Sequence, residues 1–430
     1  MRAQRPQLGH HGLDQRLCDR ARGGGLPGGP AALARVAVQG ELADHQQRRG
    51  HVGAGLLAVQ DAQAPQLRGE LGGLGGRVGV GDADQDEQAG LADRPDRAPL
   101  DLDGGRTDSL YDCSHGTPFW TRRKGGSEMS VIVEVVRSGF VESTHHARML
   151  TVDAEGRPVE TRGAVHVPAS PRSSMKPLQA LGMLRSGLRL EGELLALACA
   201  SHSGEPFHVD GVRKILAGAG LEESALLCPE DYPADRAVTE RGRVFMNCSG
   251  KHAAMLATCV ANDWPLTTYL EPAHPLQRAI RETVEELTGE RVAASGVDGC
   301  GAPLFFVSML GVTKAFRAFP LSSEDSYERK IFDAMRAHPE WTSGTDRPEA
   351  KLMRALPGLM VKAGAEAFDA FVFEDGRAGT VKIEDGFQRA RVPVTVAALR
   401  SLGLDAPELA ELGAPAVLGG GRPVGELRVR

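Results

Sequence analysis

The chain has 430 residues, of which 25% are charged and 41% hydrophobic, and its formal net charge is −6. This acidic balance offers no basic face for a nucleic-acid backbone, and no stretch approaches the roughly 18 consecutive apolar residues of a membrane span. We therefore expect neither nucleic acid nor a membrane as a partner. The seven cysteines are scattered and no secretory signal follows the first arginines, which favours a cytoplasmic protein with reduced thiols.

The first 110 residues differ in composition from the rest of the chain. They contain no lysine, asparagine, isoleucine, phenylalanine, tyrosine or tryptophan, and glycine tracts interrupt them. Such a segment lacks the large apolar side chains that offset the conformational entropy of folding. Most of the missing residue types have AT-rich codons, as in a GC-rich frame that is not translated. We divide the chain into residues 1–128, a disordered or mistranslated extension, and residues 129–430, a catalytic domain that starts at Met129.

From residue 131 the chain shows regular patterns. Valines at 131, 133, 135 and 136 predict a strand, residues 147–152 a second strand, and residues 153–156 a turn into a third strand that ends near residue 167. Helices are expected after Pro171, with Pro177 in the first turn, and over residues 194–200, 209–216 and 276–287. Gly289 is placed to end the last of these helices.

The C-terminal part returns to strands. Residues 368–373 and 380–383 predict a hairpin, residues 387–402 a helix and residues 424–429 a last strand. Strands, then a long helical run, then strands again predict an α/β (α+β) domain with an antiparallel sheet and an inserted helical region.

The first candidate for chemistry is an S-x-x-K pattern formed by Ser173 and Lys176. Residues at i and i+3 share one face of a helix, so the hydroxyl and the amine can meet. A lysine whose pKa falls on burial can take the proton of a serine nucleophile. The alternative is an ordinary helix cap with a solvated lysine.

A second pattern lies far along the chain. Lys362 and Gly364 form a K-x-G before the expected hairpin, and Ser201 and Ser203 lie between the two patterns. Serine β-lactamases and penicillin-binding proteins use S-x-x-K, S-x-N and K-T-G in this order. Here Ser203 replaces the usual asparagine and Ala363 the usual threonine. Two Ser–Lys pairs are therefore possible: Ser173 with Lys176, and Ser201 with Lys362.

A third candidate is a cysteine cluster. Cys248 and Cys300 lie in glycine-flanked turn segments, and two thiolates bind zinc when a third ligand joins them. His252 is the conventional third ligand, whereas Lys251 needs a depressed pKa because an ammonium has no lone pair. The alternative is that both thiols are buried and inert. Three other cysteines stand in apolar surroundings and are expected in the core: Cys199, Cys228 and Cys259.

Five blocks of sequence together resemble the asparaginase II family, the thermolabile rhizobial type with a serine-β-lactamase-like fold. These blocks are P-R-S-S-M-K-P at 171–177, C-A-S-H-S-G-E at 199–205, N-C-S-G-K-H at 247–252, D-G-C at 298–300 and V-K-I-E-D-G at 381–386. The resemblance runs from about residue 131 to residue 429. It implies an amidohydrolase that converts L-asparagine to L-aspartate and ammonia, and a homodimer.

The resemblance also implies roles for single residues. Ser173 with Lys176 and Ser201 with Lys362 would form two Ser–Lys tandems near the substrate. Which serine attacks is open from the sequence, and we favour Ser173 because it stands at a helix start with its base one turn away.

Binding roles follow from the same resemblance. Arg172 would contact the carboxylate of the substrate, and Asp298 would hold its α-amino group. Cys248, Lys251 and Cys300 would bind one zinc ion, with water as the fourth ligand, and this zinc would tune affinity rather than act as the primary catalyst.

Two other functions compete with this one. A β-lactamase or penicillin-binding-protein-like hydrolase acts on another amide or peptide, but its usual place outside the cytoplasm requires an export signal. The other is a non-catalytic zinc-binding protein on the same scaffold. Such a protein would not need its nucleophile and base positions, whereas all of them are filled in this sequence.

Overall fold

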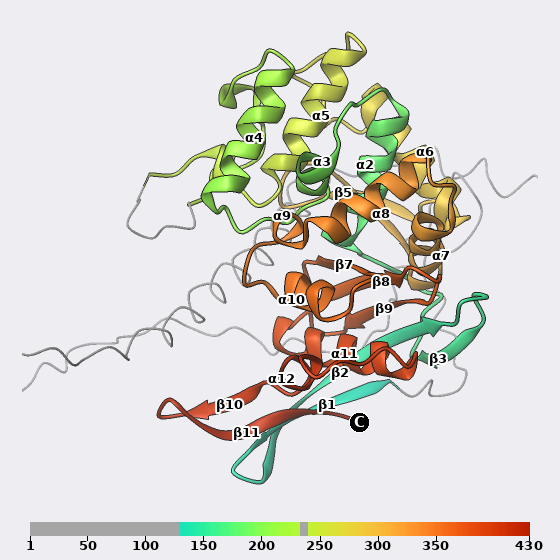
Figure 1. Ribbon diagram of the computed structural model, residues 1–430, viewed down its shortest axis with the longest axis vertical. Helices are drawn as coiled ribbons and strands as arrows, with labels where there is room; N and C mark the ends of the chain where they lie inside the picture. The colour runs from blue at the N-terminus through green and yellow to red at the C-terminus, as the bar shows by residue number, and fades with distance from the viewer. Residues whose placement is uncertain (1–129, 233–239) are drawn as a thin grey trace, which may run out of the picture. The chain divides into compact units, whose positions relative to one another are not determined.

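The computed structural model describes residues 130–232 and 240–430 (Figure 1). The expected extension over residues 1–128 and the expected start at Met129 lie outside the described residues. Helices and antiparallel strands are combined in the described part, which confirms the mixed fold class with a helical insertion.

The main sheet has eight strands in the order β10-β11-β1-β2-β9-β8-β7, with β3 paired to β2. All pairs between neighbours are antiparallel. The strands are β1 (Val131–Arg137), β2 (Phe140–Val152), β3 (Pro158–Arg162), β7 (Leu359–Gly364), β8 (Phe368–Phe373), β9 (Ala378–Ile383), β10 (Ala416–Gly419) and β11 (Arg422–Val429).

The helical insertion lies in sequence between β3 and β7. It contains α2 (Lys176–Arg185), α3 (Gly192–Ala198), α4 (Pro206–Gly218), α5 (Ser249–Ala261), α6 (Pro275–Thr288), α7 (Met309–Leu321), α8 (Tyr327–Ala337) and α9 (Pro339–Thr342). A small sheet in the order β4-β6-β5 accompanies them, with β4 (Pro168–Ala169), β5 (Ala294–Val297) and β6 (Pro303–Ser308).

Both faces of the main sheet are covered. The helices α10 (Pro348–Ala355), α11 (Arg391–Ser401) and α12 (Leu409–Gly413) lie on the side opposite the helical insertion, as Figure 1 shows. Along β8, Phe368, Ala370 and Val372 face the insertion, while Phe371 faces α11. Successive side chains of a strand point to opposite faces, so this alternation explains why β8 is buried along most of its length.

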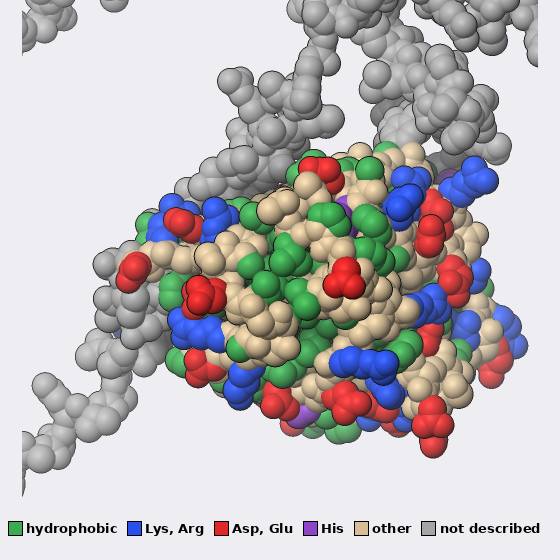
Figure 2. All heavy atoms as spheres, turned by 90° about the horizontal axis from the view of Figure 1, so that it is seen from above, with side chains coloured by type: hydrophobic (Ala, Val, Ile, Leu, Met, Phe, Trp, Pro, Cys, Tyr) green, Lys and Arg blue, Asp and Glu red, His purple; other side chains and the backbone are tan. Residues whose placement is uncertain are grey.

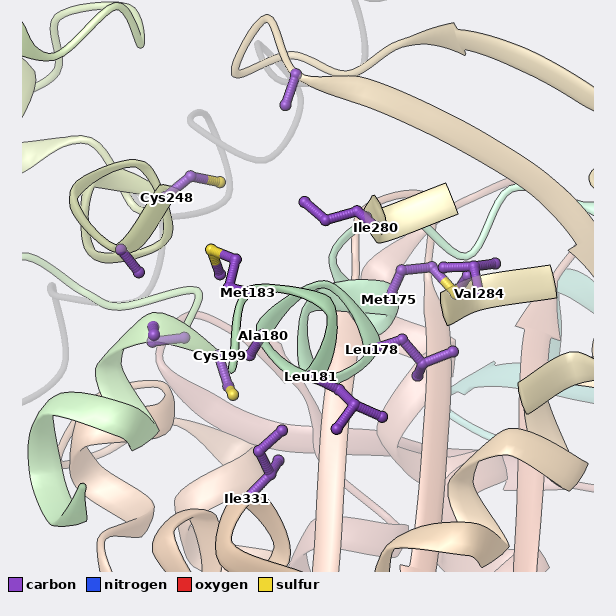
Figure 3. Close-up of a cluster of buried hydrophobic side chains, with 14 of the residues drawn as sticks. Met175, Leu178, Ala180, Leu181, Met183, Cys199, Cys248, Ile280, Val284 and Ile331 are labelled. Carbon is purple, nitrogen blue, oxygen red and sulfur yellow. The ribbon is translucent and has the colours of Figure 1, made fainter. Parts of the chain in front are cut away.

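The helix α2 forms the centre of the insertion. Figure 3 looks along it, and its side chains reach Cys199 and Ile331 on one side and Ile280 and Val284 of α6 on another. The cysteines expected in the core are all buried, which confirms their interpretation: Cys199, Cys228 and Cys259.

Several local predictions are confirmed by the chain geometry. Pro177 stands in the first turn of α2, where its missing N–H costs little. The helix α6 ends at Gly289, whose φ of +71° lies in the left-handed region. His274 precedes this helix and its Nδ1 accepts a hydrogen bond from the Leu276 N–H at 3.1 Å, so it caps the helix start.

Other predictions need correction. The second strand begins at Phe140 rather than residue 147, and the third ends at Arg162. Residues 388–390 form a short 3-10 helix, η5 (Gln388–Ala390), before α11. The strands β7 and β10 were not predicted, and neither were the three short strands of the small sheet.

The surface carries charges of both signs. Figure 2 shows the face seen from above, where apolar side chains gather centrally and acidic and basic side chains are interspersed around them. Within the described part of the chain, no helix has both the length and the apolar character needed to cross a bilayer.

Candidate active site

Ser201 lies between two buried lysines. Its Oγ is 3.0 Å from Lys176 Nζ and 2.9 Å from Lys362 Nζ. Each lysine is 1% exposed and also donates to a carbonyl oxygen, Lys176 to Ala200 at 2.5 Å and Lys362 to Ala363 at 2.6 Å. The structure therefore brings three of the four predicted catalytic residues together around one hydroxyl.

These three residues come from separate elements. Lys176 is the first residue of α2, and Ser201 follows the end of α3. On β7, Met360 faces the helical insertion and Val361 faces the opposite side. Because side chains alternate along a strand, Lys362 faces the insertion, where Ser201 lies.

Lys362 is poised to accept a proton. Burial of its amine, and then the positive charge of Lys176, lower the pKa of Lys362 to about 7, against opposing effects of Glu349, Cys248 and Asp369. An amine with such a pKa is partly neutral near pH 7, which a general base requires.

Ser173 lies apart from this hydrogen-bonded group. It belongs to a 3-10 helix, η2 (Arg172–Met175), and is half-buried, and its hydroxyl bonds to no other described side chain or backbone group. The expected contact from Ser173 to Lys176 is replaced by the contact of Lys176 with Ser201. Lys176 is the first residue of α2, and its amine donates to the Ala200 carbonyl oxygen and the Ser201 hydroxyl instead of to Ser173.

Ser174 joins the two lysine-bearing segments. Its buried hydroxyl is 2.8 Å from the Lys362 carbonyl oxygen and 3.3 Å from that of Phe368. At Gly364 an added Cβ would stand 2.2 Å from the Pro171 carbonyl oxygen. Only glycine permits this approach of β7 to η2, which is the physical reason for the glycine of the K-x-G pattern.

The two predicted substrate-binding residues are paired. Arg172 Nε donates to Asp298 Oδ1 at 2.6 Å, and the side chains are 9% and 11% exposed. Arg172 has a φ of +49°, a backbone region that a bulky residue rarely adopts. Burial alone would raise the pKa of Asp298, but the charges of Arg172 and Lys251 lower it. Asp298 is therefore a carboxylate at neutral pH.

The cysteine cluster lies two residues from Asp298. Cys248 stands at the N-terminus of α5, Lys251 in the first turn, and Cys300 in the turn between β5 and β6. Lys251 Nζ donates to Cys300 Sγ at 3.1 Å, and all three residues are buried. The structure thus brings the three predicted zinc ligands together.

The ionisable groups of this cluster have pKa values shifted in different directions. The neighbouring Cys248 side chain, and the charge of Lys251, lower the pKa of Cys300 to about 6 although burial opposes this. The neighbouring Cys300 and burial raise the pKa of Cys248, whose thiol donates to Asn247 Oδ1 at 2.9 Å. Burial would lower the pKa of Lys251, but the negative charges near it raise it.

His252, the conventional third ligand, turns to another partner. Its Nδ1 is 2.7 Å from the Tyr269 hydroxyl, and burial together with Lys251 lowers its pKa to about 3. Among the described residues, no group of three or more histidines, cysteines and carboxylates could hold a metal. A metal at this cluster therefore depends on Lys251.

The sequence interpretation missed His202, which joins the serine site to the cysteine cluster. Its buried ring has Nε2 2.9 Å from Ser249 Oγ, and its Nδ1 accepts from the Gly204 N–H at 3.2 Å. Its place between Ser201 and Ser203 is the signal in the sequence that could have identified it.

A serine hydroxyl flanked by two buried amines fits the class of hydrolases that activate a serine. The family model described as L-asparaginase II matches residues 133–429. The chain therefore belongs to the L-asparaginase II family, and its domain is an asparaginase-type amidohydrolase. In the comparison with curated proteins, nothing matches the chain.

Proposed function

We propose that the protein hydrolyses L-asparagine to L-aspartate and ammonia. The observation that carries the proposal is the contact of both buried lysines with Ser201, in a chain of the L-asparaginase II family. A serine beside a neutral amine is the requirement for acyl transfer from a side-chain amide.

The proposed substrate orientation uses Arg172 and Asp298. Asparagine carries an α-carboxylate and an α-ammonium group, which complement a guanidinium and a carboxylate respectively. Arg172 Nε lies 2.6 Å from Asp298 Oδ1, so the two side chains form a pair of opposite charges. We propose that the substrate inserts between them and presents its amide to the serines.

In the proposed reaction Ser173 attacks. Its Oγ forms a bond to the amide carbon while its proton passes to Lys176, which at the same time gives a proton through the Ser201 hydroxyl to the neutral amine of Lys362, and the carbonyl oxygen becomes an oxyanion. Ser201 lies between the lysines and can pass a proton between Lys176 and Lys362. The C–N bond then breaks, ammonia leaves with a proton from Lys176, and water hydrolyses the aspartyl ester.

One observation favours the other serine. The hydroxyl of Ser201, not that of Ser173, touches both amines, so Ser201 itself can attack with Lys362 as its base. In that case Ser173 binds the substrate, and its replacement leaves turnover largely intact. The paired serine variants in the Discussion separate the two assignments.

We further propose one zinc ion at Cys248, Lys251 and Cys300. The sulfur and nitrogen donors match the preference of zinc for tetrahedral sites with an open position. The low pKa of Cys300 supplies a thiolate, and Lys251 must lose its proton to bind. When bound, zinc would tie the β5–β6 turn to α5 and so hold Asp298, which lies in that turn, in place for substrate binding.

The first experiment is the release of ammonia from asparagine by the purified chain, with glutamine as a second substrate. Activity on asparagine supports the proposal, whereas turnover of a chromogenic cephalosporin without asparaginase activity would replace it with a β-lactamase-like function. We also propose that the protein is a homodimer and lies in the cytoplasm. Sedimentation equilibrium tests the dimer, and cell fractionation tests the location. Mass spectrometry of the native N-terminus tests the start at Met129.

A further inference from the structure

The backbone of Ser201 depends on a distant segment. Its N–H donates to the Thr342 carbonyl oxygen at 3.2 Å. Three residues further on, Thr345 is tied to Glu205: the Thr345 N–H donates to Oε1 at 2.9 Å and its hydroxyl to Oε2 at 2.6 Å. Ser203 also donates to Glu205 Oε1, at 2.6 Å. We call the hydrogen bonds between Glu205 and Thr345 the latch.

A second tie runs beside the latch. His208 Nδ1 accepts from the Glu205 N–H at 3.2 Å, so Nε2 carries the proton and donates to the Glu340 carbonyl oxygen at 2.9 Å. Burial lowers the pKa of His208, which keeps the ring neutral and suited to these two bonds. The ring of His208 also stacks on that of His202, with centroids 5.1 Å apart.

The loop held by the latch passes close to the serine segment. Gly344 has a φ of +148°, and an added Cβ would lie 2.3 Å from Ser203 Oγ. The backbone of residues 342–345 therefore runs against residues 201–205, and Glu205 bridges the two segments with two charge-assisted hydrogen bonds from Thr345. Such bonds are shorter and stronger than neutral ones.

We propose that Glu205 is a positioning residue of the active site: the latch fixes residues 342–345, which hold the amide of Ser201 and so keep its hydroxyl between the two lysines. The proposal rests on the proposed function, because it concerns the same serine. Arg172 and Asp298 lie on other segments, η2 and the β5–β6 turn, so substrate binding does not depend on the latch.

The chain offers variants for each part of the latch. Glu205→Ala removes the acceptor, Thr345→Ala removes one donor, and Thr345→Ser restores it. Glu285→Gln is the matched control, since this half-buried glutamate of α6 also accepts a backbone N–H, from Val292 at 3.0 Å, away from the serines.

The first readout is hydrogen exchange of the backbone in the full chain. Glu205→Ala and Thr345→Ala should speed exchange of the Ser201 amide and its neighbours, while Glu285→Gln should not. This measurement needs no activity, so it tests the latch even if the parent does not hydrolyse asparagine. Unchanged exchange at Ser201 in a folded Glu205→Ala overturns the proposal.

The second readout is the division of the loss between kcat and KM. Displacing a reacting group by about 1 Å can cost about 100-fold in rate, so Glu205→Ala should lower kcat about 10- to 100-fold and change KM by less than about threefold. Thr345→Ser should recover most of the loss seen in Thr345→Ala. The double variant should be no slower than Glu205→Ala alone, because both changes break one contact.

The outcomes separate the two proposals. A parent without amidase activity but with a latch-dependent Ser201 amide contradicts the proposed function alone. An active parent whose kcat is unchanged in Glu205→Ala and Thr345→Ala contradicts the positioning role, as does a loss confined to KM. If Glu205→Ala does not fold, the comparison of Thr345→Ala with Thr345→Ser decides.

Discussion

The serine site and the cysteine cluster each contain a fully buried lysine, and the two lysines differ in charge. Burial and the neighbouring Lys176 lower the pKa of Lys362 to about 7. Lys251 experiences the same burial, but the negative charges of Cys300 and Asp298 raise its pKa. Two lysines in one core are therefore suited to opposite tasks.

This difference shows that the charge of a buried amine is set by its neighbours as much as by its burial. Lys362 can hold or release a proton near neutral pH and suits base chemistry. Lys251 stays an ammonium beside a thiolate until a cation replaces its proton. The predictions below test whether the serine site carries turnover and the cysteine cluster carries affinity.

The largest effect is expected at the serines. Ser173→Ala should lower kcat at least about 1000-fold, because residues that act as one catalytic unit contribute this much. Ser201→Ala should cost less, since a water molecule can replace a relay hydroxyl. The measurement is ammonia release under saturating asparagine. A Ser173→Ala enzyme with parental rates and an inactive Ser201→Ala would assign the attack to Ser201.

Another buried cation, Arg391, also depends on the charges of its neighbours. Arg391 donates to Asp369 Oδ1 and Glu349 Oε1, each at 2.6 Å. Arg391→Met leaves two carboxylates buried without their partner, and should lower the free energy of unfolding by about 3–5 kcal/mol. Urea unfolding measures this, with the exposed pair variant Arg157→Met as control. An unchanged unfolding midpoint for Arg391→Met would contradict the expectation.

The pH profile tests Lys362 directly. Its neutral form is the base, so kcat/KM should rise about tenfold per pH unit below pH 7 and level off above it. The folded chain also holds fewer protons than the unfolded chain between about pH 7 and pH 10.5, so the stability contributed by Lys362 rises with pH there. A flat rate profile from pH 5 to pH 8 is incompatible with Lys362 as base.

The smallest effect on turnover is expected at the cysteine cluster. Cys300→Ser should abolish stoichiometric zinc and raise KM, while kcat falls by less than about tenfold, because the cluster lies beside Asp298 rather than beside the serines. Metal analysis and steady-state kinetics on the same samples check this, with buried Cys259→Ser as control. A metal-free parent removes the zinc proposal.

Much of the frame could be predicted from local patterns. The apolar period and the flanking Pro275 and Gly289 defined α6, and the alternating valines defined β1. Cys248 and Cys300 were candidates because of their glycine-flanked turns, whereas Lys251 as the third ligand was expected only through the family resemblance. Their spacing along the chain contains no information about a contact between α5 and the β5–β6 turn.

The contacts that complete the site could not be predicted. Lys176 donates to Ala200 and Ser201 rather than to Ser173, and these partners lie 24 and 25 residues further along the chain, after the end of α3. The bonds from Glu205 to Thr345 cross 140 residues of chain. Local propensity describes neither, since both result from how distant segments meet.

The position of the last strand has a consequence for synthesis of the protein. In the main sheet β11 lies between β1 and β10, so the first strand of the sheet along the chain pairs with the last one. Lys362 likewise reaches Ser201 from 161 residues further along the chain. A nascent chain that lacks these strands has its serines but not its second lysine. A chain synthesised only as far as β6 therefore cannot yet form the contact of Ser201 with both lysines.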